Sequence, residues 1–535
     1  MPMRNAECGM RNERYPLPLW RRTGGPPSGR LCLPFRIPHT AFRIGSVAAG
    51  CVALYLLFFD RLADRDLWSS HEARAAMDAQ SVLDGDWRLP HLYDGRAELQ
   101  KPPLYYWLAA LASAPRGAAD AWAVRLPAAL SALGGVLLLA AVGRRRGRPL
   151  AGIAAGLILA TAIHFTWLAR IARIDMPLSL TTALAVLCIH QAGRESRGTA
   201  RLLLLLGYLA MAAGVLLKGP VGLILPGGVL VTNHFLDVAV GRRPAHSAFR
   251  IPHSALGLAL VAALTLPWFV WANRHTGGEF FREFVWRHNV ERGLGDGDLR
   301  SHPWWLYLPY FADDFLPWTP LLPLAAYLFV RRGWWRDDPD MRLGLVWLVV
   351  IVGGLSLSSF KRSDYLLPAY PGAALFLGCA AQRWRDEATR QGGTPAALAP
   401  LAPILVVLVA ACAVAGWFVR VHWSLPRKEP FRDYTRFAAV VRRHAPAPAE
   451  VVFFRTEAHA LAFHTGRPLR TLSDWDDLAA WLQSGGTRYV VLPPHAAAEA
   501  PAAVRGVRWE VVASNAELAG GEHERPLLLL RAVPP

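Results

Sequence analysis

Uncharged or nearly uncharged apolar runs alternate with short charged segments along most of this chain. Several of these runs reach the ~18 residues that are typical of a membrane-spanning helix. They predict eleven spans, at residues 44–59, 126–142, 150–169, 176–192, 202–217, 220–236, 254–272, 315–330, 343–360, 365–382 and 396–419. The pattern therefore predicts an α-helical polytopic membrane protein.

Arginine-rich connections set the expected orientation of the spans. They occur in alternate loops, at residues 144–146, 194 and 197, 242–243, 331–332, and 383 and 385. Because basic loops tend to stay in the cytoplasm, we expect these loops and the basic tail 1–43 inside. The apolar stretch 104–114 is short for a span and would reverse the alternation. We therefore expect an interfacial helix there, with Tyr105, Tyr106 and Trp107 at headgroup depth.

The composition changes at about residue 424, where the last span ends. Short runs rich in β-branched and apolar residues predict buried strands at 451–454, 489–492, 509–512 and 527–530. Helical spacing occurs at 431–444 and at 475–482. We therefore expect a transmembrane domain at 44–423, followed by a small extracytoplasmic α/β domain at 424–535.

Composition and charge agree with a membrane protein. The 535 residues are 53% hydrophobic and 18% charged, whereas soluble chains carry about 25% charged residues. The formal net charge of +18 could suggest nucleic acid, but the arginines follow the loops as the positive-inside bias predicts. A nucleic-acid partner is therefore not expected, and no cysteine spacing typical of a metal site is present.

The first loop (residues 60–120) contains the most informative polar residues. It carries Ser70-His71-Glu72-Ala73-Arg74 and, at its other end, Lys101-Pro102-Pro103. Glu72 could act as a base near the membrane surface, and Lys101 is a compact cation suited to a phosphate group. The plainer interpretations are a solvated carboxylate beside Arg74 and a lysine that extends to the headgroups. The concentration of charged groups where spans end favours an active site.

The other loops predicted outside bring further cations to the membrane surface. Arg170, Arg173 and Asp175 precede one span, and could instead form a structural salt bridge. Lys218 lies in a turn, His288 in a longer loop, and Lys361 and Arg362 stand close to Tyr365. Cations on this side run against the positive-inside bias, so a bound lipid phosphate is the expected reason for them.

The order of these motifs resembles bacterial members of glycosyltransferase family 39, the protein O-mannosyltransferase and aminoarabinose transferase relatives. The resemblance spans roughly residues 66–377. It is carried by Glu72-Ala73-Arg74, Gly85-Asp86-Trp87, Lys101-Pro102-Pro103 with Tyr106-Trp107, Ala172-Arg173-Ile174-Asp175-Met176-Pro177, Lys218-Gly219-Pro220, His288-Asn289-Val290-Glu291-Arg292, Pro317-Trp318, Lys361-Arg362 and Leu367-Pro368-Ala369-Tyr370-Pro371. It implies the GT-C membrane fold, a polyprenyl-phosphate sugar as donor and a periplasmic active site.

The same resemblance implies roles for single residues. Glu72 matches the second residue of the family's Asp-Glu pair, while His71 stands where the family has Asp, which leaves open which of the two is the base. Asp175 matches the acidic residue of a second loop, and Lys101 matches the lysine that contacts phosphate. Gln100 replaces a residue that is often acidic in the family, which puts a metal ligand there in doubt.

The sequence thus predicts a glycosyltransferase of the bacterial inner membrane that moves a sugar from a polyprenyl phosphate to a hydroxyl of a lipid, glycan or protein. Glu72, His71 and Asp175 are the expected catalytic residues. The expected phosphate contacts are Lys101, Arg74, Arg173, Lys218, Lys361 and Arg362, with Tyr106, His288 and Tyr365 as further substrate contacts. No cofactor is expected, and a divalent metal is not supported. The alternatives are a transporter or flippase and a non-catalytic binder of lipid-linked sugars.

Overall fold

The computed structural model describes residues 39–92, 94–241, 251–291, 301–390, 401–467, 469–483 and 486–533. Most of the basic tail, Arg242, Arg243 and Arg292 therefore lie outside the described residues. The chain divides into two compact units, Met1–Gly50 and Cys51–Pro535. Of the first unit only the beginning of helix α1 (His39–Phe58) is described, and the second unit contains all the other elements.

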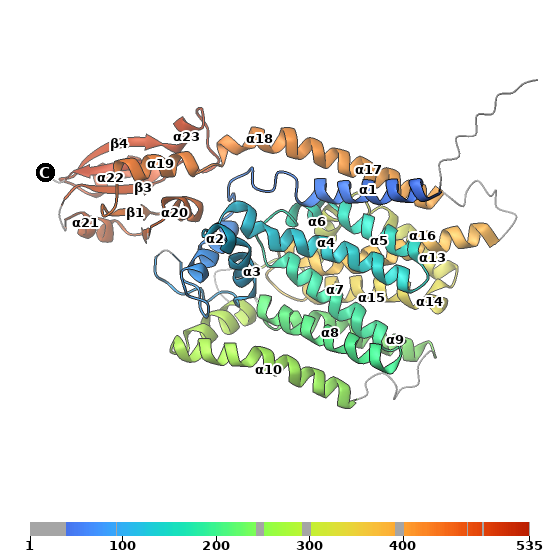
Figure 1. Ribbon diagram of the computed structural model, residues 1–535. Coiled ribbons are helices and arrows are strands. Elements are labelled where there is room, and N and C mark those ends of the chain that lie inside the picture. Colours follow the sequence, from blue (N-terminus) through green and yellow to red (C-terminus); the bar gives the residue numbers. More distant parts are fainter. Residues whose placement is uncertain are drawn as a thin grey trace, which may run out of the picture. The chain divides into compact units, whose positions relative to one another are not determined.

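Helices form the membrane part of the second unit (Figure 1). They are α2 Ser70–Leu83, α3 Leu104–Ser113, α4 Ala121–Arg145, α5 Pro149–Thr161, α6 Ile163–Leu168, α7 Asp175–Ala192, α8 Arg197–Lys218, α9 Val221–Ala239, α10 Ile251–His275, α12 Tyr307–Asp314, α13 Leu321–Arg331, α14 Trp334–Asp337, α15 Pro339–Ser356, α16 Tyr370–Arg390 and α17 Leu401–Val419. Each predicted span overlaps one or two of these helices or α1.

Six helices among the described residues are long and apolar enough to cross a membrane. They are α4, α8, α9, α10, α15 and the segment that begins with α17. Three shorter apolar helices, Gly45–Phe58, Pro149–Thr161 and Leu321–Arg331, overlap three further predicted spans, at 44–59, 150–169 and 315–330. The protein is therefore a polytopic membrane protein, and the expected total of eleven spans remains a prediction.

Helix α5 contacts α4, α16 and α17, while α7 contacts α4, α8 and α9. Figure 1 shows α10 beside α8. Close approach between α8 and α9 depends on glycine. A Cβ atom at Gly222 would lie 2.0 Å from the carbonyl carbon of Gly214, so only hydrogen fits there. A larger side chain must push the two helices apart.

Gly222→Ala is therefore expected to destabilise the protein by about 1–3 kcal/mol, the usual cost of forcing extra volume into a packed interface. The midpoint of SDS-induced unfolding in mixed micelles measures this change. Gly227→Ala, on the same helix, is the matched control because a Cβ atom there meets nothing within 4 Å. Equal midpoints for the two variants would contradict the close packing of α8 on α9.

Helix α3 coincides with the predicted interfacial segment, but its tyrosines do not lie at a lipid boundary. Tyr105 is 0% exposed and Tyr106 is 5% exposed, because helix α3 packs against α2 and α4. The Tyr105 hydroxyl donates to the Val124 carbonyl at 2.8 Å. The expectation of headgroup contact was wrong for these two rings, since a helix of the first loop covers them.

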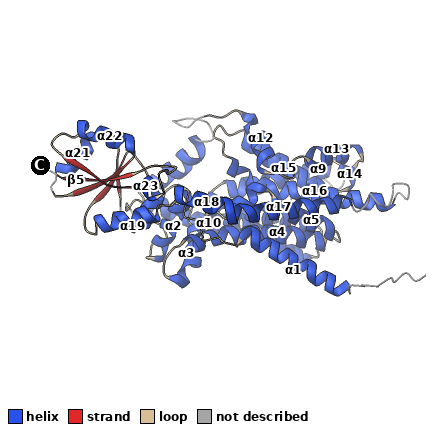
Figure 2. Ribbon diagram, turned by 90° about the horizontal axis from the view of Figure 1, so that it is seen from above, coloured by secondary structure: helices blue, strands red, loops and turns tan. Residues whose placement is uncertain are grey.

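A mixed five-stranded sheet forms the core of the C-terminal part, which we call the sheet domain (Figure 2). Its elements are α18 Leu425–Lys428, α19 Thr435–His444, β1 Val451–Phe454, α20 His459–Thr465, β2 Arg470–Leu472, α21 Trp475–Gln483, β3 Arg488–Leu492, α22 Pro494–Ala503, β4 Arg508–Ser514, α23 Asn515–Leu518 and β5 Leu528–Val533. The strand order is β2-β1-β3-β5-β4, with β1 parallel to β2 and β3. The four predicted strands are confirmed, and the three-residue strand β2 was missed.

Both faces of this sheet are covered, so its strands are apolar on both sides. Val452 and Phe454 of β1 pack with residues of α21 and α22. Val451 and Phe453 face the other way, among residues of α19, α20, α2 and α3. This accounts for strands that read as continuous apolar runs, as expected when both faces are buried.

Hydrogen bonds join the first loop to the sheet domain at Asp66. Its carboxylate accepts from the Tyr434 amide at 3.0 Å and lies 2.5 Å from Nε2 of His464. The Asp66 amide in turn donates to Glu429, whose other oxygen accepts from the Trp68 indole at 2.7 Å. We call these contacts the Asp66 clasp. It fixes the segment that leads into α2.

Candidate active site

Helix α2 brings the residues of the His71 motif to one place. Its first turn is capped by Ser69, whose hydroxyl accepts from the Glu72 amide at 3.2 Å. Residues three and four positions apart share a helix face. His71, Arg74 and Ala75 accordingly line one cavity, while Glu72 points elsewhere.

Glu72 is held between two arginines in the protein interior. Its side chain is 1% exposed, with Oε2 2.8 Å from Arg65 and Oε1 2.7 Å from Nε of Arg125. The Ala172 amide also donates to Oε1, at 3.3 Å. Burial alone would raise the pKa of Glu72, but Arg125 and Arg65 outweigh it and lower this pKa to about 2. A carboxylate so placed does not reach the cavity and is poorly suited to accept a substrate proton.

Arg125 does more than pair with Glu72. Its guanidinium is fully buried and donates to the carbonyls of Leu62 and Arg65, both at 2.9 Å, and of Asp66 at 2.8 Å. The turn before α2 is thereby tied to α4. Glu72 and Arg125 together fix the start of the first loop, and neither residue contacts the cavity that His71 lines.

That cavity, which we call the cationic cavity, has a volume of about 140 Å³. Nine of the predicted site residues line it: His71, Arg74, Lys101, Tyr106, Arg173, Asp175, Lys218, Arg362 and Tyr365. They come from segments as far apart in sequence as α2 and the loop before α16. Its lining contains five cationic side chains and two carboxylates, Glu98 and Asp175. The walls therefore favour an anion.

Ion pairs arrange the cations on one side of the cavity. Arg173 lies 2.6 Å from Asp364 and 3.3 Å from Asp175. Lys218 pairs with Asp175 at 2.5 Å, and its Nζ lies 4.0 Å from the centre of the Tyr365 ring. Because these carboxylates are each shared between cations, they orient the positive groups without neutralising all of them.

Arg74, at the other end of the His71 motif, is oriented by Glu98 and Gln100 of the first loop. Its guanidinium lies 2.7 Å from Glu98 and 3.2 Å from the amide oxygen of Gln100. The backbone N–H of Gln100 donates to the other Glu98 oxygen at 2.7 Å. Glu98 is only 2% exposed, and nothing in the local sequence pattern marks it as the partner of Arg74.

His71 stands at the cavity wall beside two of the cations. Its Nε2 lies 3.2 Å from Arg362, which can only donate, so this nitrogen is the acceptor and Nδ1 carries the proton. Burial within the walls, together with the charges of Arg173 and Arg362, lowers the pKa of His71 to about 4. The imidazole is therefore neutral near pH 7, with a lone pair directed at Arg362.

Two predicted contacts lie elsewhere. Lys361 is 4% exposed, and its ammonium donates to the carbonyls of Ser358 and His302. His288 pairs with Glu283 at 3.0 Å. Neither Lys361 nor His288 is among the residues that line the cationic cavity. Their placement gives no support to the predicted roles in substrate binding, because Lys361 faces nearby carbonyls and His288 faces Glu283 of its own helical segment, Phe281–Glu291.

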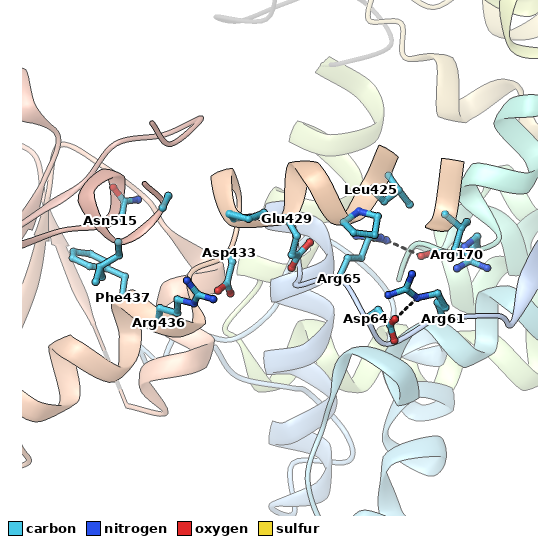
Figure 3. A pocket seen from close by; sticks show the side chains of 15 residues that line it. Arg61, Asp64, Arg65, Arg170, Leu425, Glu429, Asp433, Arg436, Phe437 and Asn515 are labelled. Atoms are coloured by element: carbon cyan, nitrogen blue, oxygen red, sulfur yellow. Dashed lines mark hydrogen bonds and ion pairs between the residues drawn. The ribbon is translucent and has the colours of Figure 1, made fainter. Parts of the chain in front are cut away.

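A larger cavity of about 250 Å³ lies where the first loop meets α18, α19 and α23 (Figure 3). Arg61, Arg65, Arg170 and Arg436 line it together with Asp64, Glu429 and Asp433. Figure 3 shows Arg61 directed at Asp64, and Arg65 donating to the Arg170 carbonyl at 2.7 Å. Because acidic and basic groups are nearly matched here, this cavity has a weaker preference for anions than the cationic cavity.

No cluster of three or more His, Cys, Asp or Glu side chains suited to a metal ion occurs in the part of the chain that the structure describes. Five cationic side chains supply positive charge in the cationic cavity. What the cavity can do chemically is hold a phosphate group against several guanidinium and ammonium groups, with a neutral imidazole next to them.

The chain is similar in sequence to a known protein family and to individual transferases. A family model described as dolichyl-phosphate-mannose-protein mannosyltransferase matches residues 100–271. An undecaprenyl phosphate-alpha-4-amino-4-deoxy-L-arabinose arabinosyl transferase of Pseudomonas paraeruginosa is 30% identical over 71% of this chain and 66% of its own length. The chain thus spans just under two thirds of that relative. A transferase of the same name from Pseudomonas savastanoi pv. phaseolicola is 27% identical over 80% of this chain and 82% of its own length.

Solved structures share the fold. The crystal structure of ArnT from Cupriavidus metallidurans bound to undecaprenyl phosphate is 20% identical, with a TM-score of 0.75 over 92% of this chain and 98% of that chain. An oligosaccharyltransferase from Archaeoglobus fulgidus is 12% identical, with a TM-score of 0.52 over 81% of this chain and 64% of that chain. The first likeness includes nearly all of both chains, so the GT-C fold expected from the sequence is confirmed.

Proposed function

We propose that this chain, which belongs to the membrane glycosyltransferases of family 39, transfers a sugar from a polyprenyl-phosphate donor to a hydroxyl acceptor. The observation that carries the proposal is the cationic cavity, whose lining has five cations against two carboxylates. The names of the relatives point to undecaprenyl phosphate as the carrier and to a pentose as the transferred group. The acceptor is a lipid, a glycan or a protein.

The leaving group explains the excess of positive charge. When the bond between the anomeric carbon and the phosphate oxygen breaks, the polyprenyl phosphate gains negative charge. Fixed cations around the developing charge stabilise the transition state more than the ground state. Lys101, Arg74 and Arg173 line the cavity together with Lys218 and Arg362, and we assign the phosphate to them.

His71 is the proposed base, and Glu72 is the residue that positions it. The acceptor hydroxyl attacks the anomeric carbon, its proton passes to Nε2 of His71, and polyprenyl phosphate departs. In the free protein this nitrogen faces Arg362. A bound phosphate draws Arg362 away and leaves the lone pair open to the acceptor. Asp175 holds Lys218 and Arg173 in place.

His71→Gln is expected to lower the transfer rate by ~10²–10⁴-fold, the usual contribution of a positioned base. A base must be unprotonated, so the wild-type rate should fall as the pH drops through about 4, the pKa of His71. A histidine at its ordinary value would lose activity near pH 6.5. Rates of polyprenyl phosphate release between about pH 3 and pH 8 measure both effects. A rate in His71→Gln equal to the wild type would remove His71 from the mechanism.

The proposed function itself is tested with purified protein and a labelled polyprenyl-phosphate sugar. Release of free polyprenyl phosphate together with labelled acceptor supports the transferase. Movement of intact donor across proteoliposome membranes, without release, would instead indicate a flippase. Binding without either outcome would indicate a non-catalytic protein that holds lipid-linked sugars.

We also propose that the protein lies in the bacterial inner membrane, with residues 1–43 in the cytoplasm, the transmembrane domain at 44–423 and residues 424–535 in the periplasm. The alternation of arginine-rich loops supports this orientation. The cationic cavity would then face the periplasm, because residues of the first loop line it and the Asp66 clasp joins that loop to the sheet domain.

A further inference from the structure

The sheet domain contains an open groove that the proposed reaction does not use. Its volume is about 550 Å³, within the range of sites that hold small ligands. Arg467, Arg470 and Arg488 line it together with Glu450 and Trp481. Three guanidinium groups thus face one carboxylate, so this groove has an excess of positive charge.

The topology of the sheet explains why these residues meet. Strands β1, β2 and β3 run parallel, so their amino ends lie at one edge of the sheet. Glu450 precedes β1, Arg470 begins β2 and Arg488 begins β3. At the opposite edge Arg455 follows β1, donates to the Ser473 carbonyl at 3.1 Å and pairs with Glu499 at 3.2 Å.

The three arginines of the groove differ in the hydrogen-bond and ion-pair partners that their guanidinium groups have. Arg488 pairs with Glu450 at 2.9 Å, and its guanidinium lies 4.5 Å from the centre of the Trp481 ring. Arg470 is exposed. Arg467 donates one bond to the Ala449 carbonyl at 3.0 Å, but its Nε and Nη2 are enclosed and have no hydrogen-bond partner among the described residues. An enclosed guanidinium without partners is costly, so a small side-chain movement that brings Nε and Nη2 of Arg467 to an anion in the groove is favoured.

We propose that this groove binds a phosphate-bearing saccharide. Arginine matches phosphate oxygens with paired N–H donors, which suits Arg470 at the start of β2 and Arg467 just before that strand. Trp481 supplies an aromatic surface next to them. That this saccharide is part of the acceptor rests on the function proposed above. The sheet domain would then hold the acceptor by a group other than the hydroxyl that reacts.

Isothermal titration of the full-length protein in lipid nanodiscs tests the proposal, with glucose 1-phosphate, glucose and inorganic phosphate as probes at equal ionic strength. The Lys101→Met background is used throughout, so that the cationic cavity contributes less to the signal. We expect glucose 1-phosphate to bind at least tenfold more tightly than either other probe. Glucose and inorganic phosphate separate the contributions of the sugar and of the anion.

Arg467→Ala with Arg470→Ala should weaken the binding of glucose 1-phosphate at least tenfold. Arg470→Ala alone should weaken it about threefold, and its exposed side chain makes a folding defect an inadequate explanation. Arg508→Ala is the matched control, because this arginine lies on the same sheet with its side chain 80% exposed. A double variant that binds like its parent, or an equal loss in Arg508→Ala, would overturn the groove as the site.

The link to the acceptor has its own readout. In the otherwise wild-type protein, the same double variant should raise the KM for a phosphorylated acceptor while leaving kcat within about twofold. An unchanged KM would overturn the acceptor assignment. If no variant and no wild-type protein releases polyprenyl phosphate, the function proposed above fails, whereas the titration still decides whether the groove binds a phosphate-bearing saccharide.

Discussion

Glu72→Gln is expected to destabilise the protein by about 3–5 kcal/mol, the usual result of removing one partner from a buried ion pair. Arg65 and Arg125 both lie within 3 Å of this carboxylate in the interior. A neutral amide leaves the two guanidinium groups without a counterion. The NH₂ group of the amide then points at an N–H donor of an arginine. The SDS concentration at half-unfolding in mixed micelles measures the loss.

Glu510→Gln is the control for this experiment. Glu510 pairs with Arg508 at 3.2 Å at the surface of the sheet domain, with 37% of its side chain exposed. Exposed pairs contribute at most about 1 kcal/mol, so this variant should unfold close to the wild type. Equal stability of Glu72→Gln and Glu510→Gln would contradict the assignment of Glu72 to the support of the first loop.

The pH profile distinguishes the two roles considered for Glu72. If this residue only positions the first loop, the folded fraction of Glu72→Gln keeps the acid limb of the wild type, near pH 4, because His71 is still the base. If Glu72 were the base, that limb would disappear together with most of the rate. Rates must therefore be expressed per folded molecule.

Lys101→Met is expected to reduce the transfer rate by ~10²–10³-fold, as removal of one group that stabilises developing charge commonly does. Lys101 lines the cationic cavity. Methionine keeps much of the length of the side chain and removes its charge. The donor's KM should change less than kcat, because the charge that Lys101 meets grows as the sugar–phosphate bond breaks.

Lys361→Met is the matched control, since both lysines were expected to contact phosphate from sequence. Lys361 directs its ammonium at the carbonyls of Ser358 and His302 and does not line the cavity. Its loss should lower stability and leave the rate per folded molecule within about threefold. If the two variants lost the same rate, the cavity would not be where the phosphate departs.

Local patterns were sufficient to predict much of the architecture. Apolar runs without charges match helices such as α4 and α15, and runs such as 489–492 match strands of the sheet domain. These patterns work because burial along one short segment is a local property of the sequence. Strand β2 was missed because three residues are too few to show a period.

The site could be predicted only as a group of loops. Nine of the residues that were expected from motifs near the ends of spans line one cavity. The partners of Glu72 were not predictable, because Arg125 begins what looks like a plain apolar span, and Arg65 lies in an unremarkable turn. Whether Glu72 faces substrate or protein depends on contacts across 53 residues of chain, which no local pattern reports.

The Asp66 clasp has a consequence for building hybrids of this protein with its relatives. A carboxylate, a histidine and a backbone amide from opposite ends of the polypeptide complete one another there. A chimera that exchanges residues 424–535 alone leaves Asp66 and Trp68 facing foreign side chains. Exchange of the segment 60–69 along with the C-terminal part keeps the donor and acceptor pairs intact. A functional hybrid therefore has to take these two stretches from the same parent protein.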